Sequence, residues 1–294
     1  MSVKKRRAAS SEISREKKLG GHQNERDFAD LIGGQRIVGT KKGDVLDPKG
    51  HKYSVKSGKK WQIFLYSYER ILQSNFLNIL TPCLEAFTTD AELYFTDREI
   101  CLQYKEAYIA KHGREKAKIL KNEEIKKKFS NNEYIKSKDK LAQSTIEVCE
   151  NLKLTSNRRK FLQEAIFNGM EVSFLAIKDD TFRRDGAYRI YEREEVLSIL
   201  SSELIPGTSN AGHVPEDYNV SGQKTLLRYK TDSGIEKNIV EIEIRNDSIQ
   251  HFREVRFNMY SKDTLILLDK HLGKKSSKSL GHGVFALGSA SSIL

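Results

Sequence analysis

The sequence holds few cysteines, and their spacing excludes two common ways of stabilising a small fold. Cys83, Cys101 and Cys149 are far apart, without a Cys-x-x-Cys pair or a nearby group of histidines. A structural zinc site and a disulfide framework are therefore not expected.

Long apolar runs are also absent. The basic start, Lys4 to Arg7, is not followed by an apolar stretch, so it does not read as a secretory signal. The mean hydropathy of −0.58 indicates a soluble protein, and no amphipathic helix with an exposed aromatic face argues for a membrane partner. We expect a cytoplasmic protein whose residues 1–20 form a basic flexible tail.

The chain shows no internal repeat, and its closing Gly281 to Gly288 stretch lacks the strand-loop-helix setting of a nucleotide-binding loop. Positive charge, in contrast, is abundant. Lysine and arginine number 51 against 40 acidic residues, which gives a formal net charge of +11. This excess favours a polyanionic partner and salt-dependent binding, without distinguishing DNA from RNA.

The stretch 43–58 is predicted to form a β-hairpin. Its centre, Asp47-Pro48-Lys49-Gly50, suits a type I turn closed by a left-handed glycine. The register set by this turn places Asp44 opposite Ser54, with Lys56 two residues farther along the second strand. Because side chains alternate along a strand, these three polar residues are expected on one face and apolar residues on the other.

The hairpin resembles the PD-(D/E)xK nuclease superfamily, best known from type II restriction endonucleases. The superfamily has an aspartate at the start of one strand and an acid-x-Lys tripeptide on the next. The resemblance implies that Asp44 binds a metal ion, that Lys56 is catalytic and that the Val55 carbonyl is a backbone ligand. Ser54 stands where the superfamily usually has a second acid. In this respect the chain resembles superfamily members with Ser, Asn or Gln at that position. Ser54 would at most hold a metal-bound water.

Glu25 is a candidate for the missing second acid. It shares a helical stripe with Phe28, Ala29 and Ile32, so its carboxylate is in line with the buried face of the predicted helix. The resemblance implies a helical glutamate that reaches the metal directly or through water. A solvated surface glutamate is the alternative.

Apolar residues recur with helical spacing over 61–72, which predicts a helix after the lysine strand. Gln62 and Tyr66 would share a second face of this helix, and Gln-x-x-x-Tyr resembles an accessory motif that steadies the active site or the DNA backbone. Gln62 is therefore a candidate catalytic residue, although a surface role is the alternative. Lys59 and Lys60, beside it, are expected to contact DNA.

These residue types fit the hydrolysis of a phosphodiester. The negative charge of the ester repels a nucleophile, so a divalent ion is needed to neutralise the phosphate and to lower the pKa of a bound water. Mg²⁺ prefers oxygen ligands, here assigned to Asp44, Glu25 and the Val55 carbonyl. Lys56 would orient the attacking water and offset developing charge. The alternatives are an Asp44 that begins a strand and a Lys56 that protects a sheet edge.

The expected fold is a mixed α/β one: a restriction-endonuclease-like core with a mixed β-sheet flanked by helices, a helical insertion and a β-rich C-terminal part. The catalytic core would span 21–100, with its last strand at 91–95. A charged helical region would follow at 101–168, including the basic run 158–160, which could track phosphates or form a solvated helix face.

The remaining residues, 169–294, are predicted to form a β-rich DNA-recognition region with strands near 171–177, 188–191, 224–230 and 237–245. Glu241 and Glu243 are a rival metal site, but no lysine stands two residues beyond either, and a solvated strand face is the simpler interpretation. Arg253, Arg256 and Asn258 have the side chains that read guanine and adenine edges.

The sequence therefore predicts a Mg²⁺-dependent type II restriction endonuclease acting on double-stranded DNA. Such an enzyme implies a homodimer, which cuts both strands of a symmetric site, and a companion DNA methyltransferase in the same cell. The alternatives are a structure-specific or repair nuclease of the same fold, and a nucleic-acid-binding protein that has lost catalysis with the acid at Ser54.

Overall fold

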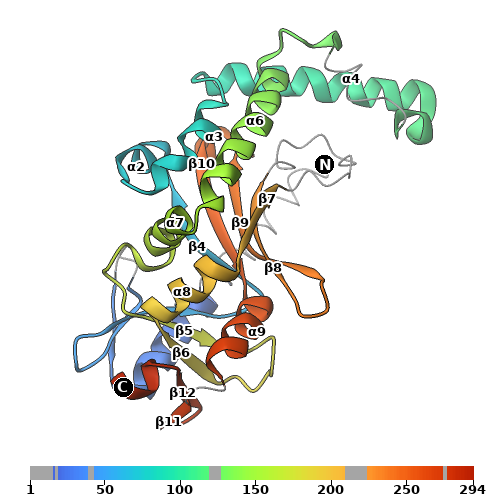
Figure 1. Ribbon diagram of the computed structural model, residues 1–294. Coiled ribbons are helices and arrows are strands. Elements are labelled where there is room, and N and C mark those ends of the chain that lie inside the picture. Colours follow the sequence, from blue (N-terminus) through green and yellow to red (C-terminus); the bar gives the residue numbers. More distant parts are fainter. Residues whose placement is uncertain (1–15, 17–18, 39–42, 119–126, 209–223, 274–276) are drawn as a thin grey trace.

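The protein combines helices with two β-sheets, one mixed and one antiparallel (Figure 1). The computed structural model describes residue 16 and residues 19–38, 43–118, 127–208, 224–273 and 277–294. Most of the basic tail expected at 1–20 lies outside these residues. The predicted mixed α/β composition is confirmed.

The seven-stranded sheet collects strands from distant parts of the chain, in the order β1-β2-β3-β5-β6-β12-β11. β3 is parallel to β5 and β6 to β12, while the other neighbours are antiparallel. The strands are β1 (Gln35–Arg36), β2 (Val45–Leu46), β3 (Lys52–Lys56), β5 (Phe174–Lys178), β6 (Tyr188–Glu192), β11 (Ser277–Gly281) and β12 (Val284–Leu287). The sheet that contains the hairpin thus includes strands formed by residues far beyond residue 100. The expected domain boundaries stay a prediction.

The five-stranded sheet is antiparallel throughout, in the order β4-β10-β9-β8-β7. Its strands are β4 (Lys60–Tyr66), β7 (Ile205–Thr208), β8 (Thr225–Lys230), β9 (Glu236–Arg245) and β10 (Glu254–Tyr260). Three residues, 57–59, separate β3 from β4. The chain therefore passes from the first sheet to the second immediately after the lysine strand.

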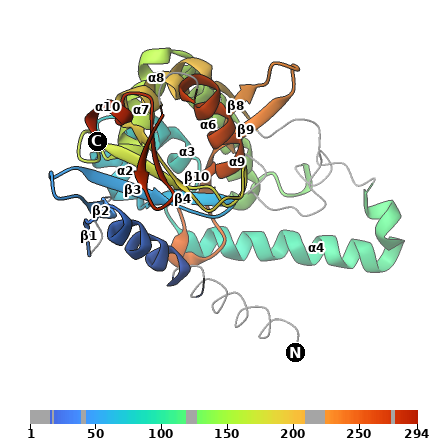
Figure 2. The ribbon, with the colours of Figure 1, turned by 90° about the horizontal axis from the view of Figure 1, so that it is seen from below.

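Helices surround both sheets, and α4 extends away from the rest of the molecule (Figures 1 and 2). A helix at 19–31 precedes β1. The others are α2 (Tyr68–Gln73), α3 (Thr81–Glu85), α4 (Ala91–Lys118), α6 (Glu133–Lys153), α7 (Thr155–Phe167), α8 (Arg193–Glu203), α9 (Ser261–Leu272) and α10 (Ala290–Ile293), with 3-10 turns η1 (Leu77–Leu80) and η3 (Ile249–His251). None of the described helices is long and apolar enough to cross a membrane.

Each face of the seven-stranded sheet has its own apolar core. On one face, Tyr53 of β3 packs with Phe28 of the helix at 19–31 and with Phe174 of β5. Leu175 and Ile177, which alternate with Phe174 along β5, belong to the larger cluster that includes α7 and α8. Helices therefore cover both faces of this sheet, as Figure 2 shows.

The helix predicted over 61–72 is wrong for its first half. Lys60–Tyr66 form strand β4, and the helix α2 begins at Tyr68. A short run of aromatic and branched residues satisfies both the helical and the strand period, so spacing alone does not decide between them. Pairing with β10, with Trp61 opposite Met259, stabilises the strand.

The strand predicted at 91–95 is also wrong, because α4 begins at Ala91. The Asp90 carboxylate accepts a hydrogen bond from Leu93 N at 3.0 Å, which caps the first turn. Burial follows the helical period, since Tyr94 is fully buried whereas Leu93 is exposed. In the residues that the structure describes, the helical region predicted at 101–168 is confirmed, and so are the four strands predicted after residue 169. Helix α8 lies between the second and third of those strands, α9 follows the last of them, and neither helix was predicted.

Candidate active site on the β2–β3 hairpin

The hairpin forms with the predicted turn and register. Asp47 N donates to His51 O at 3.0 Å, and Gly50, with φ of +89°, closes the turn by donating its N–H to Asp47 O. The Asp47 carboxylate also accepts bonds from the N–H groups of Lys49 and His51 and from the Tyr53 hydroxyl. Burial raises the pKa of Asp47, but the bonds from His51 and Tyr53 outweigh it and lower that pKa overall. An ionised aspartate therefore organises the turn.

This register brings Asp44 and Lys56 together. Lys56 Nζ lies 3.0 Å from Asp44 Oδ2, and the side chains of both residues are largely shielded from solvent. The same oxygen accepts bonds from Val55 N at 2.7 Å and from the buried Ser54 hydroxyl at 3.4 Å. The predicted convergence of Asp44, Ser54 and Lys56 is confirmed as geometry.

The Lys56 ammonium lies between two oxygens that the resemblance assigns to a metal ion. Its second partner is the Val55 carbonyl oxygen, 3.1 Å from Nζ. The Asp44 carboxylate and the Val55 carbonyl, both hard oxygen donors, thus already contact the Lys56 ammonium. This donor set suits Mg²⁺, which needs few protein ligands because it keeps several waters.

Glu25 does not complete this site. Its Oε2 accepts a 2.6 Å bond from Arg36 Nε of β1 and lies 3.2 Å from His22 Nδ1. Across the described parts of the chain, no three His, Cys, Asp or Glu side chains are grouped so that they could hold a metal ion. The expected metal role of Glu25 therefore gains no support, because Arg36 already pairs with its carboxylate.

Gln62 loses the helical setting on which its predicted role depended. It lies on β4, opposite Asn258 of β10, and belongs to the other sheet. Its side chain is exposed, and in a strand Gln62 and Tyr66 do not form the helical pair that the accessory motif requires. The exposed Lys59 lies just before this strand.

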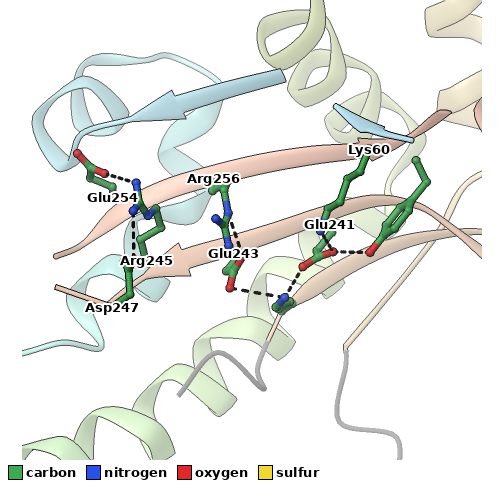
Figure 3. Close-up of polar contacts among 9 residues, drawn as sticks. Lys60, Glu241, Glu243, Arg245, Asp247, Glu254 and Arg256 are labelled. Atoms are coloured by element: carbon green, nitrogen blue, oxygen red, sulfur yellow. Dashed lines mark hydrogen bonds and ion pairs between the residues drawn. The ribbon is translucent and has the colours of Figure 1, made fainter. Parts of the chain in front are cut away.

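Lys60 and Arg256 belong to an ion-pair network on the five-stranded sheet (Figure 3), and their contact with DNA stays a prediction. Lys60 Nζ lies 2.7 Å from Glu241, which also accepts bonds from Lys224 and the Tyr260 hydroxyl. Arg256 pairs with Glu243. Glu241 and Glu243 are buried, so the simpler interpretation of a solvated strand face is wrong. Lysine and arginine side chains pair with both carboxylates.

Arg253 is held by contacts within the protein, and Asn258 is buried. Arg253 Nε donates to Leu84 O at 3.1 Å, and its guanidinium stacks over the Tyr68 ring. Asn258 is 5% exposed, too little for its amide to reach a base edge without rearrangement. The base-reading role of these residues stays a prediction that the geometry does not favour.

Asn24, Lys178 and Tyr188 approach the candidate site without having been predicted. Asn24 Nδ2 donates to the hydroxyl of Ser57, the residue after Lys56, at 2.9 Å. Its Oδ1 accepts a 2.9 Å bond from Lys178 Nζ, and its backbone carbonyl accepts one from the Tyr188 hydroxyl. The available signal was the position of Lys178 at the carboxyl end of an apolar strand, where ligand-binding residues of parallel strands are common.

Comparisons of the chain with protein-family models, with curated proteins and with solved structures found no match. The candidate function therefore depends on the geometry of the site and on the resemblance of the hairpin motif.

Proposed function

We propose that the protein is a Mg²⁺-dependent endonuclease of double-stranded DNA that resembles type II restriction enzymes of the PD-(D/E)xK superfamily. The observation that carries the proposal is the 3.0 Å approach of Lys56 Nζ to Asp44 Oδ2 at the end of the hairpin. A mixed sheet with helices on both faces, as the superfamily implies, supports it.

Asp44 and the Val55 carbonyl would hold the metal ion, with water and a substrate phosphate oxygen as further ligands. When bound, Mg²⁺ supplies charge neutralisation of the phosphate and a more acidic water. Because Lys56 now contacts both protein oxygens, it must turn toward the substrate when they bind a metal ion. There it orients the attacking water and offsets the charge that develops on the phosphate.

Ser54 takes a supporting role in this proposal. Its buried hydroxyl donates to Asp44 Oδ2 and thereby holds the carboxylate toward the end of β3. Glu25 is left out of the metal site, since Arg36 and His22 bind its carboxylate.

The proposed partners follow from the same function. A net charge of +11 suits a DNA duplex. Cleavage of both strands at a symmetric site calls for a homodimer, and the host genome would need a companion methyltransferase acting on the same site in the cytoplasm.

Digestion of phage DNA tests the proposal. With Mg²⁺, the parent protein is expected to give discrete bands, while Asp44→Ala and Lys56→Ala lose nearly all cutting and keep their affinity for DNA. Lys52→Ala is a matched control, because Lys52 lies at the other end of β3 and pairs with Glu171. Full cutting by either site variant would refute the assignment.

A catalytically inactive DNA-binding protein is the second candidate function. Its support is the single carboxylate at the site, where an ammonium already contacts the two assigned ligands. DNA binding without cleavage under either Mg²⁺ or Mn²⁺ would select this function. A smear of products instead of bands would select a structure-specific or repair nuclease.

A further inference from the structure

We propose that Lys178 is a second phosphate-binding cation of the candidate active site and that Asn24 positions it. The inference rests on the proposed function, since it names a further residue that would contact the DNA backbone there.

The topology of the sheet places Lys178 beside the end of the lysine strand. β3 and β5 are parallel neighbours, with Lys56 paired to Ile177. Both strands therefore end at the same edge of the sheet, and Lys178 is the residue directly after Ile177. The carboxyl edge of parallel strands is where α/β proteins commonly bind ligands.

Asn24 joins these two strand ends through its side chain. It donates to Ser57 Oγ and accepts from Lys178 Nζ, each at 2.9 Å. The Tyr188 hydroxyl donates to the Asn24 backbone carbonyl at 3.0 Å, which fixes the asparagine from the β6 side. Lys178 is thus tied through one side chain to the residue that follows Lys56.

The charge of Lys178 is available for a ligand. In the part of the chain that the structure describes, Lys178 takes part in none of the observed ion pairs, and its contacts are the Asn24 amide oxygen and the Tyr188 ring, 5.8 Å from Nζ. Lys60 and Arg256, by comparison, are neutralised by glutamates. A half-buried ammonium with a neutral partner retains donors that can bind a phosphate oxygen.

The two lysines, Lys56 and Lys178, would have different roles. Lys56 acts at the reacting phosphate, whereas Lys178 would bind a neighbouring phosphate of the same strand and fix the register of the DNA. Lys178 would therefore be a DNA-binding residue, and its loss should weaken binding and slow cleavage at low DNA concentration more than at saturation.

Salt-dependent binding to a short DNA duplex tests this inference, with EDTA present so that the DNA stays intact. Lys178→Met is expected to reduce the magnitude of the negative slope of log K against log salt by about 0.9, which corresponds to the loss of one phosphate contact. Lys178→Arg should keep the parent slope. Asn24→Ala leaves the charge of Lys178 in place. This variant should therefore keep the parent salt slope, while its affinity for DNA falls.

Lys52→Met is the matched control, since it removes a lysine from the other end of β3 and should leave the slope unchanged. Initial cleavage rates with Mg²⁺ are measured on the same proteins. If the parent binds and cuts DNA but Lys178→Met has the slope and rates of Lys52→Met, the inference alone is overturned. If the parent neither binds nor cuts, the proposed function fails as well.

Discussion

Arg158 lies inside the protein although it belongs to a run of three basic residues. Its guanidinium donates to the carbonyl oxygens of Ser201, at the end of α8, and of Leu152 and Lys153, at the end of α6. The positive charge thus faces two helix C-termini, where the macrodipole is negative. Arg159, in contrast, forms a partly exposed pair with Glu194. Neighbouring arginines therefore have different roles.

Replacing Arg158 by methionine should destabilise the fold by about 2 to 4 kcal/mol, because buried carbonyls would lose their donor. The same change at Arg159 should cost less than about 1 kcal/mol, as is usual for a partly exposed ion pair. Urea unfolding of both variants measures the difference. Equal stability of the two proteins would contradict the buried role of Arg158.

Glu241 makes the stability of the protein depend on acidity. Burial by itself raises the pKa of Glu241, but bonds from Lys224, Lys60 and Tyr260 outweigh it and lower that pKa from 4.5 to about 2. A lowered pKa in the folded state stabilises the protein above the unfolded value. This contribution is complete above about pH 4.5 and is lost as the pH falls toward 2.

Glu241→Gln should therefore unfold more easily at pH 7, by about 3 kcal/mol, and should lose less stability than the parent between pH 5 and 3. Denaturant unfolding at several pH values measures both effects. Glu236→Gln, on the exposed start of the same strand, is the control and should follow the parent curve.

At the scale of elements, the hairpin was predictable because its own residues determine it. The turn needs a left-handed residue at Gly50, and Asp47 satisfies the turn with its own carboxylate. The strand β4 was not predictable from spacing, since its pairing partner β10 lies about 190 residues later and is not visible in a short window.

The same limit applies to the site. Asp44 and Lys56 are 12 residues apart and were found from the local pattern. The bond between Lys178 and Asn24 joins residues 154 positions apart, and the carbonyl of Ser201 is 43 positions from Arg158. Such contacts depend on how the sheets and helices pack, so a single sequence does not reveal them.

Two glycines, Gly21 and Gly50, predict opposite effects of substitution by alanine. Gly50→Ala should destabilise the hairpin by about 1 kcal/mol, since φ there is +89° and an added methyl group meets no atom that could offset the strain. Gly21→Ala should stabilise the protein by up to about 1 kcal/mol, because Gly21 lies in the helix at 19–31 with open space around it. Thermal unfolding measures both, and a shift of the same sign would contradict these backbone conformations.

At the scale of the whole molecule, the proposed function requires that two chains act together. One copy carries one Asp44–Lys56 pair, and under the proposed function one such pair would cut one strand at a time. A symmetric dimer places a second pair on the opposite strand, so both cuts occur in one encounter. The chain mass of 33.7 kDa should then double in sedimentation experiments with duplex DNA absent.

Supercoiled plasmid with one target site separates this behaviour from that of a monomer. A dimer should convert it to linear DNA with little nicked circle, because both strands are cut before the enzyme leaves. A mixed population of parent and Lys56→Ala chains should accumulate nicked circles, since a heterodimer has one intact site. Nicked circles as the main product of the parent alone would mean that each chain acts by itself, and the proposed homodimer would be wrong.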